Sequence, residues 1–234
     1  MVTVGGSEAI DIALRAMVNP GDEVLIPQPS YVSYVPCTVL AGGKPVIIEL
    51  EEKDQFRLTP EKLREKITDR TKILILPFPN NPTGAVMRKA DLEAIAEVIL
   101  EHDLFVLSDE IYCELTYGSQ PHVSIISLPE MKERTVLING FSKSYAMTGW
   151  RLGYAAAPHI ILEQMLKIHQ YAIMCAPTTS QYAAISALKN GDADVAMMRE
   201  AYDQRRRFVL HAFKEMALDC FEPNGAFYAF PSIK

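Results

Sequence analysis

The chain has 234 residues, of which 49% are hydrophobic and 22% charged, and its formal net charge is −6. This length allows one large globular domain, and the negative balance argues against a nucleic-acid or anionic-membrane partner. The four cysteines are widely spaced and the five histidines are scattered, so we expect no disulfide framework and no metal site. Free thiols and the absence of a signal-peptide pattern favour a cytoplasmic protein. No uninterrupted apolar segment is long enough to span a bilayer.

Strand and helix patterns alternate along the chain. A short strand is expected at residues 2–4, and Ser7 is expected to cap a helix that runs to about Val18. We then expect, in order, strands at 23–27 and 44–50 around a helix at 31–40, a helix opened by Thr59 and Pro60, a strand at 71–78, a helix at 88–102, and strands at 104–108, 135–139 and 151–157. Helices at 160–174, 180–190 and 194–216 and a short aromatic strand at 225–231 complete the chain.

Strands joined by helices of this length predict an α/β fold. The specific expectation is a three-layer α/β/α sandwich with a mostly parallel sheet. Ligands of such sheets bind outside the carboxyl ends of the strands. Functional residues are therefore expected in the segments that follow the strands.

The segment at residues 140–153, GFSKSYAMTGWRLG, is the most informative. Lys143 stands just after a buried strand, where a lysine is poorly hydrated and can present a neutral amine to a carbonyl group. Arg151 follows eight positions later, and its fixed fork of donors suits a phosphate dianion. A lysine for an aldehyde and an arginine for a phosphate together predict a seat for pyridoxal 5′-phosphate.

Three earlier segments can supply further parts of this seat, although each alone is a weak signal. Gly6 and Ser7 lie in a glycine-containing turn before a helix, where free N–H groups bind phosphate. Tyr31 follows the second strand and could stack on a pyridine ring. Asn81 lies in a loop stiffened by prolines and offers an amide donor at a fixed place.

Asp109 closes an apolar strand, so its carboxylate is expected in a low-dielectric environment that favours a cationic partner. A protonated pyridine nitrogen is one such cation, and its protonation makes the ring an electron sink. Tyr112, three residues later, could hydrogen-bond the phenolic oxygen of the ring.

These motifs, in this order, resemble the large domain of a fold-type I, pyridoxal-phosphate-dependent class I/II aminotransferase of the bacterial aspartate or aromatic kind. They are Gly-Gly-Ser-Glu-Ala, Pro-Ser-Tyr, Asn-Asn-Pro-Thr-Gly, Ser-Asp-Glu-Ile-Tyr, Ser-Lys-Ser…Thr-Gly-Trp-Arg-Leu-Gly and Gly-Ala-Phe-Tyr. The resemblance implies an enzyme that moves an α-amino group between an amino acid and a 2-oxo acid, and that assembles as a homodimer. It also implies roles for nine residues.

By this resemblance, Lys143 joins the cofactor and moves the proton, and Asp109 pairs with the pyridine nitrogen. The remaining implied roles are contact with the 3-oxygen (Tyr112 and Asn81), stacking (Tyr31) and phosphate binding (Arg151, Gly6 and Ser7). Many relatives carry a hydroxyl residue three positions before the lysine, where this chain has Gly140. The resemblance leaves open whether Ser142 takes over that contact.

The resemblance also implies a division into a cofactor-binding large domain at 1–222 and the start of a smaller domain at 223–234. We expect the remainder of that domain, with the arginine that grips the substrate carboxylate, to be absent, and the chain to transaminate poorly. Two alternatives stay open: another fold-type I enzyme such as a carbon–sulfur lyase, or a catalytically weak cofactor-binding fragment. The cofactor-binding residues are shared by transaminases and lyases and do not distinguish between the two activities.

Overall fold

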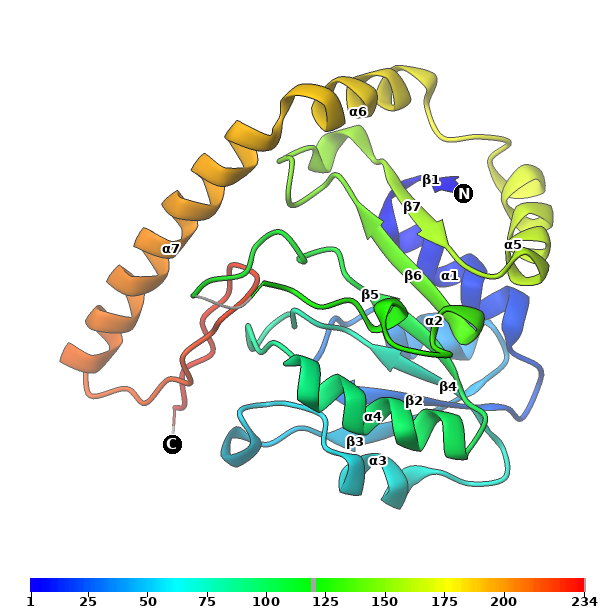
Figure 1. Ribbon diagram of the computed structural model, residues 1–234, viewed down its shortest axis with the longest axis horizontal. Coiled ribbons are helices and arrows are strands. Elements are labelled where there is room, and N and C mark those ends of the chain that lie inside the picture. The colour runs from blue at the N-terminus through cyan, green and yellow to red at the C-terminus, as the bar shows by residue number, and fades with distance from the viewer. Residues whose placement is uncertain (119–120, 234) are drawn as a thin grey trace.

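The computed structural model describes residues 1–118 and 121–233, so Lys234 of the expected segment 223–234 lies outside them (Figure 1). A seven-stranded sheet forms its centre, with the strand order β1-β7-β6-β5-β4-β2-β3. The strands are β1 (Val2–Thr3), β2 (Glu23–Gln28), β3 (Lys44–Glu49), β4 (Thr71–Leu76), β5 (Phe105–Asp109), β6 (Thr135–Gly140) and β7 (Gly153–Ala156).

The strands from β6 through β5, β4 and β2 to β3 are all paired in parallel, whereas β7 is antiparallel to both β6 and β1. Because β7 alone is reversed, β1 runs in the same direction as the five parallel strands. The carboxyl ends of six strands and the amino end of β7 therefore meet at one edge of the sheet. The mostly parallel sheet predicted from the sequence is confirmed.

The helices described by the structure are α1 (Gly5–Met17), α2 (Tyr34–Leu40), α3 (Pro60–Lys66), α4 (Lys89–Glu101), α5 (His159–Ala172), α6 (Thr178–Asn190) and α7 (Asp192–Glu215). Four short 3-10 turns, η1 (Glu52–Asp54), η2 (Ile125–Ser127), η3 (Lys132–Arg134) and η4 (Thr148–Trp150), lie in the connections. Helix α3 begins as predicted: Thr59 is its N-cap and accepts a hydrogen bond from Lys62 N at 3.4 Å, and Pro60 is its first residue.

Side chains that alternate along each strand build one core on each face of the sheet. In β4, Ile73 and Ile75 join a cluster with α1, α2 and α5, whereas Leu74 and Leu76 join a cluster with α3 and α4. Helices thus cover both faces, which confirms the three-layer sandwich. Helices α6 and α7 extend beyond these layers and arch along the outside of the molecule (Figure 1).

The structure differs from the sequence predictions in two places that matter for function. Helix α1 begins at Gly5, so Ser7 lies in its first turn and is not its N-cap. The expected aromatic strand at 225–231 does not form; its residues make isolated bridges, Gly225 to Thr116 and Pro231 to Cys220. Gly225 pairs with the loop after β5 and Pro231 with the segment after α7, so neither joins the sheet.

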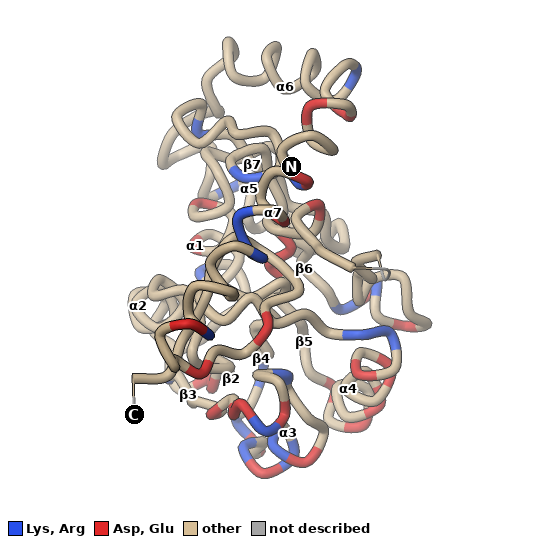
Figure 2. Tube along the Cα trace, turned by 90° about the vertical axis from the view of Figure 1, so that its left-hand side faces the viewer, with Lys and Arg blue, Asp and Glu red and all other residues tan. Residues whose placement is uncertain are grey.

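Charged residues of both signs gather on the α3–α4 side of the molecule, as Figure 2 shows. Many of them form ion pairs at the surface, for example Lys62 with Glu51 at 2.6 Å and Lys89 with Glu93 at 3.3 Å. In the described part of the chain, no helix has both the length and the apolar character needed to cross a membrane.

Candidate active site

One cavity lies at the edge where the strand ends meet. All nine residues predicted from the sequence line it: Gly6, Ser7, Tyr31, Asn81, Asp109, Tyr112, Ser142, Lys143 and Arg151. Seven of them follow a strand whose carboxyl end lies at this edge, Asp109 is the last residue of β5, and Arg151 precedes the reversed strand β7. The sheet topology therefore collects residues that are spread over most of the chain.

Among the lining residues, the guanidinium of Arg151 lies against the start of α1. Gly5 has a φ of +74°, and a Cβ at this position would lie 2.9 Å from Nη2 of Arg151. The glycine therefore allows both the turn into the helix and the close approach of the guanidinium. Helix N–H groups, the Ser7 hydroxyl and this cation are together groups that can bind an anion.

The start of α1 is held by Glu8 and not by the predicted Ser7 cap. Oε2 of Glu8 accepts a hydrogen bond from Val4 N at 2.5 Å, and Oε1 lies 2.8 Å from Nδ1 of His169 on α5. Glu8 thereby satisfies one of the free donors at the helix start. This arrangement leaves Ser7 free of a capping role, so it can face the cavity.

A side chain at position 140 has no room. A Cβ there would lie 2.9 Å from the Cα of Gly153 and 3.0 Å from the carbonyl oxygen of Leu152, because β6 and β7 approach closely. Two other hydroxyl residues, Ser142 and Thr148, line the cavity. Thr148 donates to the carbonyl oxygen of Ser142 at 2.7 Å and was not predicted from the sequence.

Asp109 also lines the cavity and is 7% exposed. Its Oδ2 accepts a hydrogen bond from the Tyr34 hydroxyl at 2.8 Å, and its Oδ1 accepts one from Ile111 N at 3.2 Å. Within residues 1–118 and 121–233, no lysine, arginine or histidine forms an ion pair with this carboxylate. A buried acceptor that lacks a cation is suited to a cationic ligand.

Burial raises the pKa of Asp109, and the hydrogen bond from Tyr34 opposes that rise. Burial also raises the pKa of Tyr34 well above its ordinary value, so the phenol keeps its proton and is the donor in this pair. Sequence reasoning missed Tyr34. The only available signal was its spacing of three residues from Tyr31, which alone does not indicate a partner 75 residues away.

Lys143 lies among aromatic rings. Its Nζ is 5.8 Å from the ring centre of Tyr112 and 5.5 Å from that of Phe227. The hydroxyl of Tyr228, which also lines the cavity, is 2.8 Å from the hydroxyl of Tyr112. The sequence contained Phe227 and Tyr228 in a recognised motif, but it gave no reason to place them in the site.

The loop after β4 is stabilised by Asn80 and presents Asn81. Oδ1 of Asn80 accepts hydrogen bonds from N and Oγ1 of Thr83, at 3.1 and 2.8 Å. The Asn80 side chain is thus occupied within the turn, and it is its neighbour Asn81 that lines the cavity. Gly84, with a φ of +72°, completes the turn.

The sheet, its strand order and the residues at its edge define an α/β protein with the fold of pyridoxal-phosphate-dependent transferases. A family model for aminotransferase class I and II matches residues 1–234. The chain belongs to this family, whose members are pyridoxal-phosphate-dependent enzymes.

Individual relatives agree with this assignment. The chain is 49% identical to an aspartate aminotransferase of Pyrococcus abyssi and 47% identical to aromatic-amino-acid aminotransferase 2 of Thermococcus litoralis. In both cases the whole chain is matched, and it spans 61% of the relative's length. The crystal structure of an aromatic aminotransferase from Pyrococcus horikoshii OT3 superposes with a TM-score of 0.97 at 49% identity, covering 100% of this chain and 63% of that one.

Proposed function

We propose that this chain binds pyridoxal 5′-phosphate and forms the cofactor-binding part of an aminotransferase that moves an α-amino group between an amino acid and a 2-oxo acid. The observation that carries this proposal is that Lys143, the carboxylate of Asp109 and the guanidinium of Arg151 line one cavity, and that in the described residues no cation pairs with Asp109. An amine, an acceptor for a cation and an anion-binding helix start match the aldehyde, the pyridine nitrogen and the phosphate of this cofactor.

Each residue has a distinct proposed task. When bound, the cofactor supplies an aldehyde that joins to amines and a protonated ring that withdraws electrons. Lys143 Nζ takes the proton from the substrate Cα and returns it. Asp109 keeps the ring nitrogen protonated, and no cation of the described residues pairs with its carboxylate in competition.

The remaining residues hold and orient the ring. In this proposal Arg151, Gly6 and Ser7 bind the phosphate, and Tyr31 stacks on the ring. Tyr112 and Asn81 bind the 3-oxygen. Because Gly140 has no room for a side chain, we assign the additional phosphate hydroxyl to Ser142.

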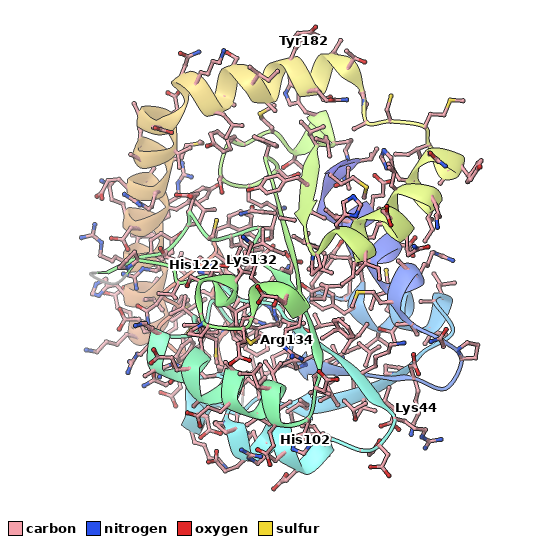
Figure 3. The ribbon with its side chains drawn as sticks, turned by 45° about the vertical axis from the view of Figure 1, so that its right-hand side comes forward. Lys44, His102, His122, Lys132, Arg134 and Tyr182 are labelled. Atoms are coloured by element: carbon pink, nitrogen blue, oxygen red, sulfur yellow. The ribbon has the colours of Figure 1, made fainter. Side chains whose placement is uncertain are left out.

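A second copy of the chain is the proposed partner. Large apolar side chains on α5, on α6 and between them are exposed: Leu166, Tyr171, Met174, Tyr182, Ile185 and Leu188. Tyr182 is 71% exposed and points away from the molecule (Figure 3). Large apolar side chains exposed in this number on neighbouring segments are typical of a protein interface. The proposed location is the cytoplasm, in keeping with four free thiols.

The cofactor proposal is tested by borohydride reduction of the protein incubated with pyridoxal 5′-phosphate, followed by peptide mapping. We expect the pyridoxyl label on Lys143, and Lys143→Ala should lose it while Lys189→Ala, an exposed lysine on α6, should retain it. A label on another lysine, or none at saturating cofactor, would contradict the proposal.

The reaction is tested with a panel of amino acids. A transaminase converts bound cofactor to its amine form with one equivalent of 2-oxo acid, whereas a lyase releases ammonia. Release of ammonia would instead support the carbon–sulfur lyase alternative, and cofactor binding with neither product would support the weak cofactor-binding fragment. Sedimentation velocity across a range of concentrations tests the second copy, and a monomer throughout would contradict it.

A further inference from the structure

We propose that Tyr228 is a positioning residue: its hydroxyl donates a hydrogen bond to Tyr112 and thereby directs the proton of Tyr112 toward the 3-oxygen of the bound cofactor. This inference rests on the proposed function. It starts from the contact of 2.8 Å between the two hydroxyl oxygens, whose residues are 116 positions apart in the sequence.

The proton count of a hydroxyl pair makes the direction of this bond important. Each phenol has one proton to donate and lone pairs to accept with. If Tyr112 donated to Tyr228, it would present only lone pairs to the cavity and would repel an oxygen there. If Tyr228 donates, the Tyr112 proton is available to the oxygen of a ligand.

The surroundings of Tyr112 leave this role to Tyr228. Tyr112 is 5% exposed, and in the described residues its hydroxyl has no hydrogen-bond partner other than Tyr228. Burial raises the pKa of Tyr112, so the phenol keeps its proton. An acceptor in the cavity would favour the arrangement in which Tyr228 donates to Tyr112 and Tyr112 donates to the ligand, because hydrogen bonds in a chain strengthen one another.

The position of Tyr228 is fixed by the backbone beside it. Ala226 N donates to the carbonyl oxygen of Leu115 at 2.8 Å, and Tyr117 N donates to that of Asn224 at 2.9 Å. The Tyr117 hydroxyl donates to the carbonyl oxygen of Ala226. These contacts tie the segment that carries Tyr228 to the loop that carries Tyr112, so the two hydroxyls are placed before any ligand arrives.

The test compares two ligands that differ by one atom: pyridoxal 5′-phosphate and its 3-deoxy analogue, which lacks the oxygen in question. Tyr228→Phe keeps the ring and removes the hydroxyl. We expect it to weaken binding of pyridoxal 5′-phosphate by about three- to tenfold, the range for one hydrogen bond, and to leave binding of the 3-deoxy analogue unchanged. In a Tyr112→Phe background, Tyr228→Phe should have no further effect on the ratio of the two affinities.

Tyr117→Phe is the matched control, because it loosens the same segment through Ala226. If the segment contributed only through its structure, each variant would weaken binding of pyridoxal 5′-phosphate and of the 3-deoxy analogue by the same factor. We expect this result for Tyr117→Phe but not for Tyr228→Phe. Equal losses for both ligands in Tyr228→Phe, or no loss for either, would overturn the inference and leave the cofactor proposal intact. Failure of the unsubstituted protein to bind pyridoxal 5′-phosphate would overturn the proposed function, and the inference with it.

Discussion

At the scale of single residues, the candidate site contains a buried carboxylate that lowers the stability of the fold. Asp109 is a buried carboxylate whose surroundings, in the part of the chain described, include hydrogen-bond donors and no cation. A site that awaits a charged ligand is expected to trade stability for function. Two predictions follow from its contacts.

The first concerns Asp109→Asn in cofactor-free protein. Burial raises the pKa of Asp109, so ionised Asp109 destabilises the fold as the pH rises from its ordinary value of 3.8 through the raised value. At pH 7 the variant should therefore be the more stable protein, by on the order of 1 kcal/mol, or a thermal midpoint roughly 2–4 °C higher. The gain in stability should disappear below pH 3.8.

With cofactor bound, Asp109→Asn should lower the rate of the reaction about 10²–10³-fold. Calorimetry that showed the cofactor-free variant to be less stable than the unsubstituted protein at pH 7 would contradict the stability prediction.

The second concerns Tyr34→Phe, which removes the strongest donor to that carboxylate. Loss of a hydrogen bond to a charged group should lower the free energy of unfolding by about 1.5–3 kcal/mol in urea titrations at pH 7. If the cost arises through Asp109, it should shrink in the Asp109→Asn background; an unchanged cost would assign it to packing.

The residues that could be predicted from the sequence are those whose position depends on one strand. Lys143 and Asp109 were assigned because each directly follows or closes an apolar run that had to be a buried strand. Tyr34 and Tyr228 could not be, because their importance depends on partners 75 and 116 residues away. Sequence periodicity indicates which face of a helix or strand is buried, but it does not identify the distant side chain that a given residue contacts. The roles of all nine predicted residues stay predictions.

At the scale of elements, the sequence predicted the order and type of nearly every helix and strand, and the errors share a cause. The start of α1 and the segment at 225–231 both depend on tertiary contacts, those of Glu8 with His169 and of Gly225 with Thr116. Local propensity was outweighed in both places. The division into domains at residue 222 likewise stays a prediction.

Glu23, the first residue of β2, provides a test of how the end of the sheet opposite the candidate site is held together. This residue on β2 is 2% exposed, and it accepts hydrogen bonds from Thr68 Oγ1 at 2.7 Å and Lys44 Nζ at 2.9 Å. These donors lower its pKa, so its stabilising effect is present above the ordinary value of 4.5 and is lost as the pH falls through the lowered value.

Glu23→Gln should therefore lower the free energy of unfolding by about 1–3 kcal/mol at pH 7, and the difference from the unsubstituted protein should shrink as the pH falls below 4.5. Glu101→Gln is the matched control, since Glu101 pairs with Arg64 at an exposed site and should contribute much less to stability. Chemical denaturation between pH 3 and 7 measures both. Equal effects of the two variants would show that burial of Glu23 adds nothing.

At the scale of the whole molecule, α7 lies apart from the three layers. Of its residues only Val195 is buried, and the helix runs along the outside of the molecule beside the segment that ends in Tyr228 (Figure 1). Arg206 makes the main polar contacts between the two. Its Nη1 donates to Glu222 Oε1 at 2.9 Å and to the carbonyl oxygen of Pro223 at 3.2 Å, and its guanidinium lies 5.3 Å from the ring centre of Tyr117.

We predict that Arg206→Ala releases α7 from the body of the protein and loosens residues 224–228 with it. Three contacts of one guanidinium are lost together, and the remaining contacts of this helix with the body, such as Tyr202 against Phe227, cannot hold 24 residues in place. Hydrogen exchange followed by mass spectrometry should show faster exchange in α7 and at 224–228, with little change in β4 and β5. Arg207→Ala, which removes only exposed ion pairs on the same helix, should exchange like the unsubstituted protein. If both variants exchanged alike, Arg206 would not be the contact that joins this helix to the site.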